Sequence, residues 1–533
     1  MGDLAKRIPA LTLAALLIIT MSGCYEFETT NTTSYTPRSA PPEVKSLHAI
    51  QVCEVFDRIN KGLPVEYDHV LIKGNLNMSQ LNLPITQVVY LNYNQGYRGN
   101  ATLVQFPINI TNSIIEGNVD LRKTIFTELV NFNNTLFDGT VDFSYSKFSK
   151  DAYFRESKFN ETADFSEVRF NETVDFQQSQ FEEYADFIRI QFNATTYFGL
   201  SQFTRTADFR SSQFNDTAEF RESKFYRDAL FSDSSFNNIT EFTRSQFNGV
   251  ADFARSNFEN TAYFSDIKFN DSDFSLAQFN GNVQFRYSRF SRDADFSASR
   301  FIKDAGFESI MFNGNADFSA SRFTKDADFE GTVFNRNAQF KGTNFLGILR
   351  LTGIKFSRID LYWPNVNRLS CNDGPTYLTL IQNFRNLEQF GAADDIYYQY
   401  RNWRRDQNSG WTKLSDYLAW ISCGYGIKPE RPVICALITL FLFGVLYFIG
   451  YRHQGATIAA SLDILNESLA FSAVALFSLP KELFPHGEKK YAKLVRQNIL
   501  RIPFRLIIFF ERLIGWSLLI LFINTLSRVM IRY

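Results

Sequence analysis

Phenylalanine recurs through the middle of this chain at alternating steps of five and six residues. The series runs from Phe154 to Phe345 with little interruption, and its next members after Phe154 are Phe159, Phe165, Phe170, Phe176 and Phe181. Each pair of steps defines an eleven-residue unit such as TADFRSSQFND, Thr206 to Asp216. Self-similarity at a fixed period indicates a repeat architecture in which every unit packs on its neighbours.

An eleven-residue period also occurs in right-handed coiled coils, so the helical interpretation needs a test. On a helix, steps of five and six residues would turn successive rings by about 140° and 240°, and no apolar stripe would form. The units are also rich in Asp, Asn, Ser and Thr, which disfavour helix interiors. The spacing instead favours an extended chain that turns one ring inward per segment and corners at polar residues.

Small residues occupy a second position that we expect to face inward, two residues before each phenylalanine. They are alanine in one half of the unit and serine in the other, as in Ala163, Ala185, Ala207, Ser157, Ser179 and Ser201. A narrow lumen filled with stacked rings is expected to leave room only for small side chains beside them.

Units such as ADFRS-SQFND resemble the pentapeptide-repeat pattern A(D/N)LXX, with Phe at the central position and one residue added per pair. The resemblance covers roughly Leu76 to Leu361 and implies a right-handed quadrilateral β-helix with four faces per coil. If two units make one coil, about ten coils stack into a rod about 50 Å long. The step from Phe269 to Phe274 is five residues where six are expected, which predicts a kink or bulge.

The N-terminal segment has the layout of a secretory signal, with Lys6 and Arg7 before an apolar run that ends in Ser22-Gly23-Cys24. We expect residues 1–24 to be a signal peptide or an uncleaved N-terminal anchor, with Cys24 as a candidate lipidation site. Residues 25–43 are expected to be a flexible linker. Residues 44–64 are expected to form an N-terminal helical cap on a solenoid over 65–361.

Asn-X-Ser/Thr sequons recur after the second phenylalanine of a unit and are candidate N-glycosylation sites: Asn160, Asn171, Asn193, Asn215, Asn270 and, one residue further on, Asn238. The register is expected to place them along one edge of the rod. Asparagine before a polar residue and threonine also suits a corner, so turn formation is the alternative explanation of each. Together with the signal, the sequons favour an exported, glycosylated rod.

The periodicity changes after Leu361, and the remaining chain is predicted to be helical and membrane-associated. Residues 362–431 are expected to form a helical neck, with one helix over 379–407. Residues 432–452 and 506–531 are long and apolar enough to be transmembrane helices. Between them, 453–505 is expected to be a basic loop with a short apolar hairpin segment at 468–479, too short to cross a bilayer.

This half, roughly residues 375 to 533, resembles pentapeptide-repeat proteins that end in a two-helix, ion-channel-like module. The similar motifs are GYGIKPER before the first apolar stretch and ERLIGWSLLILFINTLSR in the second. The sequence departs from such modules at residues 475–480, where ALFSLP stands in the place of a potassium filter such as TVGYG. This segment supplies neither the carbonyl ring nor the charged side chains that select ions.

The charges of the inter-helix segment bear on topology. Lys481, Lys489, Lys490, Lys493 and Arg496 make it basic, which favours the cytoplasmic side and places the solenoid outside, in agreement with export. A channel-like module normally has its pore hairpin outside and both ends in the cytoplasm. The resemblance and the charge pattern therefore disagree.

No catalytic, metal or cofactor site is indicated by the sequence. The four histidines are scattered, and no phosphate-binding glycine loop is present. Acids such as Asp164, Asp186 and Asp208 recur at one register, which is typical of a solvated ladder and not of a single active site. The solenoid carries a mild acidic excess that would repel nucleic acid, so no nucleic-acid partner is expected.

The sequence therefore predicts a non-enzymatic, membrane-anchored cell-envelope solenoid that acts as a structural or protein-interaction scaffold. Its repeat domain is expected to be extracytoplasmic, with protein partners on the solenoid surface. The alternative is a degenerate two-helix ion-channel-like protein with the solenoid as a regulatory or assembly domain. That alternative requires a homo-oligomer, because two helices per chain cannot enclose a pore. A third interpretation, an intracellular partner-binding rod, would require an uncleaved N-terminus and unused sequons.

Overall fold

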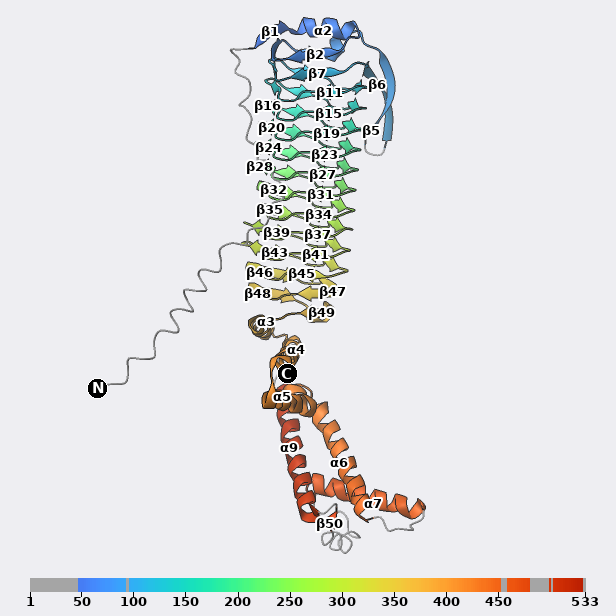
Figure 1. Ribbon diagram of the computed structural model, residues 1–533, viewed down its shortest axis with the longest axis vertical. Helices are drawn as coiled ribbons and strands as arrows, with labels where there is room; N and C mark the ends of the chain where they lie inside the picture. The colour runs from blue at the N-terminus through green and yellow to red at the C-terminus, as the bar shows by residue number, and fades with distance from the viewer. Residues whose placement is uncertain (1–46, 93–94, 452–457, 480–497, 500–501, 531–533) are drawn as a thin grey trace, which may run out of the picture.

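The computed structural model describes residues 47–92, 95–451, 458–479, 498–499 and 502–530. A β-solenoid of about 14 turns forms a rod, and helices at its lower end connect it to two long apolar helices (Figure 1). About 14 turns at the usual strand spacing give a rod of about 65 Å, so the expected ten coils and 50 Å were too few. The extra turns are at the N-terminal end, where aliphatic pairs such as Ile72 and Ile115 replace phenylalanine.

One turn of the solenoid consists of four two-residue strands. In one turn these are β14 (Lys147–Phe148), β15 (Ala152–Tyr153), β16 (Lys158–Phe159) and β17 (Ala163–Asp164). Each strand pairs in parallel with its equivalent 22 residues later, so that Phe159 of β16 lies opposite Phe181. Two eleven-residue units therefore make one four-sided turn, as the resemblance implied.

A tight turn with one left-handed residue forms a corner in each unit. After Phe154 the chain turns, and the amide of Ser157 donates to the carbonyl oxygen of Phe154 over 3.1 Å. Glu156 between them has a φ of 59°, and an equivalent left-handed residue recurs every eleven residues. A positive φ at the third position is the mark of a type II turn, which usually takes glycine there. Here glycine fills that position only in the last such corners, at Gly331, Gly342 and Gly353.

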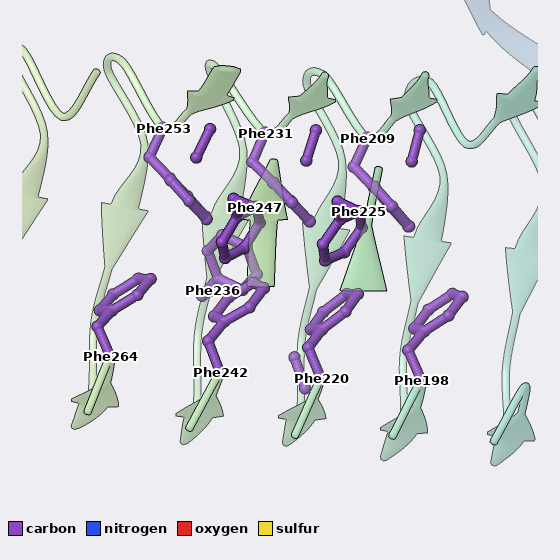
Figure 2. Close-up of a cluster of buried hydrophobic side chains, with 14 of the residues drawn as sticks. Phe198, Phe209, Phe220, Phe225, Phe231, Phe236, Phe242, Phe247, Phe253 and Phe264 are labelled. Carbon is purple, nitrogen blue, oxygen red and sulfur yellow. The ribbon is translucent and has the colours of Figure 1, made fainter. Parts of the chain in front are cut away.

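The phenylalanine rings fill the interior in parallel columns (Figure 2). Within one column, the rings of Phe198 and Phe220 are stacked. Their centroids are 4.9 Å apart and their planes are nearly parallel, with an angle of 3° between them. Between columns, Phe209 meets Phe220 edge to face at 90°. Both arrangements are favoured by the charge distribution of aromatic rings. The prediction that these rings form the core, and not an exposed binding platform, is confirmed.

The residues two positions before the rings do face inward, but size is not their only property. Ser201 is fully buried, and its hydroxyl donates to the carbonyl oxygen of Phe176 over 2.6 Å. Larger residues also occur at this register, namely Val168, Ile190, Ile267 and Ile310, and all are buried. The expectation that only small side chains fit was therefore wrong. Beside Val168 and Ile190 the ring column is looser, with 5.6 Å between Phe170 and Phe192.

The predicted irregularity near Phe269 is confirmed as a bulge. Strand β32 (Gln246–Asp252) pairs with β35 (Lys268–Asp273), and the register shifts by one residue after Phe247. After the shift, the rings of Phe253 and Phe274 on the two successive turns are again stacked, with their centroids 5.0 Å apart. The missing residue is therefore absorbed at the corner and the core stays continuous.

Both ends of the solenoid are covered. At the N-terminal end, β1 (His48–Gln51) already pairs with β3 (Val70–Lys73), and helix α2 (Val52–Asn60) buries Val55 and Ile59 on the first turn. Covering the first turn in this way removes a strand edge that could pair with other chains. A hairpin of β5 (Ile85–Asn92) and β6 (Gln95–Val104) extends along the flank of the rod (Figure 1).

The C-terminal end is covered by helix α3 (Gly374–Asn386), which follows the final strands β48 (Lys355–Leu361) and β49 (Val366–Ser370). The side-chain amide of Asn383 donates to the carbonyl oxygen of Ile359 over 2.9 Å and accepts from its N–H over 3.2 Å. These two bonds satisfy the strand edge as a further turn would. Leu380 and Phe384 of α3 extend the phenylalanine core into the neck.

The neck continues with α4 (Phe390–Gln407) and α5 (Gly410–Cys423). The single helix expected over 379–407 is in fact two helices, α3 and α4. The break is at Glu388, whose φ of 59° is incompatible with a right-handed helix.

Among the described residues, two helices are long and apolar enough to cross a membrane. They are α6 (Glu430–Tyr451) and α9 (Phe504–Met530), with mean hydropathies of 2.5 and 2.2 over their most apolar stretches. Helix α7 (Ile458–Leu476) contains most of the apolar segment predicted as a short hairpin, but it begins ten residues earlier and has 19 residues. Asp463 and Glu467 lower the hydropathy of its first half, so the sequence pattern missed that part. Helix α7 packs against both α6 and α9.

Candidate functional site

The polar contacts of the three apolar helices converge on one buried carboxylate. Glu511 of α9 is fully buried, and the hydroxyls of Tyr447 from α6 and Ser472 from α7 lie within hydrogen-bond distance of its two oxygens. The Ser472 hydroxyl is also 2.9 Å from the carbonyl oxygen of Leu440. An ionisable group in an apolar segment is costly unless it has partners of this kind. Glu511 therefore links one residue from each of the three helices.

The residues around Glu511 show how closely the apolar helices approach one another. Arg512 is exposed, whereas Glu511 points into the helix packing. Close approach at this level is allowed by glycine, because a Cβ on Gly515 would lie 1.9 Å from the carbonyl oxygen of Leu476. Likewise, a Cβ on Gly444 would lie 2.5 Å from a methyl of Leu469. Small residues at helix contacts are typical of membrane helices.

A second cluster joins the neck to both apolar helices. Arg431, at the start of α6, lies over the ring of Trp420 at 4.9 Å and donates to the hydroxyl of Tyr398 over 2.9 Å. Arg528, at the end of α9, lies over Tyr397 at 5.0 Å and is 3.8 Å from the carboxylate of Asp394. Contacts between a guanidinium and an aromatic face are stabilising, more so where water is excluded. The neck-side ends of α6 and α9 are therefore held at the same place, next to α4 and α5.

The Gly-Tyr-Gly segment 424–426 forms the turn between α5 and α6. All three residues have positive φ, from 53° to 78°. A Cβ on Gly424 would lie 2.8 Å from the side chain of Lys428, so glycine is required there by contact as well as by backbone angle. Arg401 of α4 lies 4.8 Å above the ring of Tyr425.

The candidate glycosylation sites are distributed over two edges of the rod. Asn171, Asn193 and Asn215 follow strands of one sheet and form a ladder, in which the amide of Asn215 donates to Asn193 over 2.7 Å and that of Asn193 donates to Asn171 over 3.3 Å. In the other sheet, Asn160 follows strand β16 and Asn270 lies within strand β35. The expectation of a single edge was therefore wrong, because an eleven-residue step is only half a turn.

Side-chain ladders account for the sequons in structural terms, and their use as glycan acceptors stays a prediction. Asn238, the sequon shifted by one residue, donates to Asp216 over 2.7 Å. Cys24, the candidate lipidation site, lies outside the described residues, as do the expected signal segment and linker.

Residues 110–202 and 274–355 match the family model described as pentapeptide repeats (9 copies), in segments 110–158, 143–191, 154–202, 274–322 and 307–355. The match lies on the four-sided turns and their phenylalanine columns. The solenoid is a pentapeptide-repeat domain. Comparisons with curated proteins and with solved structures gave no match.

On the pentapeptide-repeat solenoid, the recurring acids form a ladder at the predicted register, but the expectation that the ladder is solvated was wrong, because Asp208 is buried. Asp164, Asp186 and Asp208 lie opposite one another on successive turns. Burial raises the pKa of Asp186 to about 6, and the neighbouring carboxylates act in the same direction. One oxygen of Asp186 accepts from the N–H of Ile188 over 2.9 Å, so the acid also stabilises its corner. Within the described ranges, no three His, Cys, Asp or Glu side chains are placed to hold a metal ion.

A groove of about 670 Å³ on the pentapeptide-repeat domain lies between the β5–β6 hairpin and the solenoid flank. Val88 and Val89 line it on the hairpin side, and charged side chains line it on the solenoid side. Two of these charges pair with each other, with Arg189 2.7 Å from Glu167. The groove therefore shows a mixed surface suited to contact, without a grouping of catalytic side chains among its described lining residues.

Proposed function

We propose that this chain is a non-enzymatic, membrane-anchored scaffold whose pentapeptide-repeat solenoid presents its outward side chains to protein partners outside the cytoplasm. The observation that carries the proposal is the continuity of the hydrophobic core. One cluster of buried residues extends from Val55 of the N-terminal cap through the phenylalanine columns to Ile396 of α4. Arg431 and Arg528 then hold α4 and α5 to both apolar helices. A rod with such a continuous core would hold its far end at a fixed distance from the membrane.

The outward surface supports a role in interaction. At one register on one sheet the successive residues are Tyr153, Asp175, Tyr197, Glu219 and Glu241. Neighbouring turns thus present different chemistry on a fixed spacing, which is how repeat proteins form extended recognition surfaces. Catalysis would instead need a singular group of convergent side chains.

The two neck contacts, together with the charge pattern, support the proposed orientation. Helix α6 begins at the neck and helix α9 ends there. If both helices span the membrane, the segment 480–497 between them lies on the side opposite the neck. The sequence of that segment is basic, and basic loops favour the cytoplasm. The solenoid is then extracytoplasmic, in agreement with the secretory character of residues 1–24.

A second candidate function is a channel-like homo-oligomer with the solenoid as its assembly domain. It is favoured by the position of α7, which packs against both candidate spans and carries Ser472 to the buried Glu511. Re-entrant segments likewise lie at membrane depth only where they are buried against protein. In this case the solenoid would be cytoplasmic.

Labelling of single cysteines in intact cells tests the proposed orientation. We would replace the native cysteines, introduce Tyr287→Cys on the solenoid, where the side chain is 69% exposed, and compare it with Lys490→Cys in the inter-helix segment. A membrane-impermeant maleimide should label the solenoid position in intact cells and the Lys490→Cys variant only after permeabilisation. The reverse pattern would overturn the proposal and favour the channel-like orientation. Release of the protein by alkaline carbonate would contradict membrane anchoring itself.

A further inference from the structure

Helix α5 exposes an apolar stripe that the described part of the chain leaves uncovered. Trp411, Leu414, Leu418 and Ile421 are 85%, 48%, 61% and 52% exposed. Their spacing of three, four and three residues places them on one face of the helix. A soluble surface helix would normally turn such a face toward the core.

The opposite face of α5 is fixed to the neck by polar contacts. Asp416 is buried and accepts from Arg401 of α4 over 2.6 Å and from Asn408 over 2.6 Å. Trp420 donates to the hydroxyl of Tyr398 over 2.7 Å. Because these contacts set the rotation of the helix about its axis, the apolar stripe must face away from α4.

The stripe leads directly into the first membrane span. Only the turn at residues 424–426 and a few further residues separate Cys423 from α6, whose first apolar residues, Val433, Ile434, Leu437 and Ile438, are also about half exposed. Tryptophan is enriched at membrane interfaces, where its ring suits the headgroup level. Arg404, which is exposed, and Lys413, which is half-buried, lie near the start of α5 and provide cations of the kind that such helices direct at headgroups.

We propose that α5 is an interfacial helix that lies in the plane of the bilayer surface, with Trp411, Leu414, Leu418 and Ile421 inserted among the lipid headgroups and the first acyl carbons. The occupant of the stripe is thus the phospholipid surface next to α6. A second copy of the chain fits less well, because stable interfaces use about 20 to 30 residues a side. The inference rests on the membrane anchoring in the proposed function, but not on which side of the membrane the solenoid lies.

Lipid quenching in reconstituted vesicles tests the proposal on the full-length protein. In a background without native cysteines, Leu418→Cys is labelled with an environment-sensitive fluorophore. Thr412→Cys is the matched control, because this exposed position lies about 100° or more around the helix from every residue of the stripe. A third variant, Leu442→Cys in α6, reports the membrane span. The vesicles contain phosphatidylcholine and phosphatidylglycerol brominated either near the headgroup or near the end of the acyl chain.

We expect about twofold quenching of the label at Leu418 by the shallow bromines and little by the deep ones, since interfacial helices bury their apolar face about 5–10 Å. The label at Thr412 should be unquenched, and the label at Leu442 should be quenched by the deep bromines. An unquenched label at Leu418 with a quenched label at Leu442 would overturn the interfacial helix and leave anchoring intact. If neither label is quenched, the membrane anchoring of the proposed function fails. Energy transfer between copies labelled at Leu418, without lipid quenching, would identify a second copy as the occupant and would also overturn the proposal.

Discussion

Single residues at the inward register of the solenoid differ in whether their hydroxyl has a partner, and this gives a test of what the hydroxyl contributes. Ser201 donates to Phe176, whereas the buried hydroxyl of Ser321, at the same register, has no hydrogen-bond partner among the described residues. Ser201→Ala should lower the free energy of unfolding by about 1 kcal/mol. Ser321→Ala should leave it unchanged or raise it slightly. Thermal unfolding of the full-length protein in detergent compares the two variants. Equal effects on the melting temperature would show that the hydrogen bond from Ser201 does not stabilise the fold.

The acid ladder gives the solenoid a pH dependence at single positions. The pKa of Asp186 is about 6 in the folded protein, against an ordinary value of 3.8, because burial disfavours the charged form. The folded state therefore binds this proton more tightly than the unfolded state. The resulting stabilisation is fully present below about pH 4 and is lost as the pH rises through about 6.

Asp186→Asn should remove this pH dependence, because asparagine keeps the oxygen that accepts from Ile188 and carries no charge. We expect the variant to melt above the wild type near pH 8 and at the same temperature near pH 4. Asp233→Asn is the control of opposite sign. The bond from Arg255 lowers the pKa of Asp233, so this variant should melt below the wild type at neutral pH. A uniform shift of Asp186→Asn at every pH would contradict the ladder interpretation.

At the scale of single elements, the apolar helices depend on one shared acceptor. Tyr447→Phe would leave the buried carboxylate of Glu511 with one hydroxyl partner fewer. Removing one partner from a buried polar group costs about 1–3 kcal/mol, so the variant should unfold at lower temperature in detergent. Tyr417→Phe on α5 is the matched control, because that residue is partly exposed and its ring contact with Arg405 does not need the hydroxyl. Equal melting of the two variants would show that Glu511 does not hold the helices together.

What could be predicted from the sequence follows the same division of scales. The spacing of the phenylalanines was sufficient for the four-sided turn and the ring columns, because every unit repeats one local environment. The missing residue before Phe274 was likewise readable as a bulge. The partners of Glu511 were not, since Tyr447 and Ser472 are 64 and 39 residues away along the chain and no local pattern relates them. The start of α7 was missed because Asp463 and Glu467 mask its helical character in a hydropathy profile.

For the whole molecule, the structure describes one mechanical path from the far end of the rod to the two apolar helices. Each turn contacts only its neighbours, so the stability of a solenoid is approximately a sum over adjacent turns and its ends are its weakest points. The end next to the apolar helices is also the end that connects the rod to the neck. Helix α3 therefore has two roles, since it covers the final turn and connects that turn to α4.

Asn383 of α3 tests this coupling, because its side chain occupies the position of a further strand beside Ile359. Asn383→Ala leaves the amide and carbonyl of Ile359 without these partners, which should cost about 1–3 kcal/mol at the last turn. Hydrogen exchange of peptides covering β48 and β49 should then accelerate by about 5-fold to 140-fold, since each 1.4 kcal/mol corresponds to a factor of ten. Peptides around Phe209 in the middle of the rod should exchange as in the wild type. Gln382→Ala, at an exposed neighbouring position, should change neither region. Faster exchange along the entire rod in Asn383→Ala would show that the solenoid unfolds as one unit, and the independent end proposed here would be wrong.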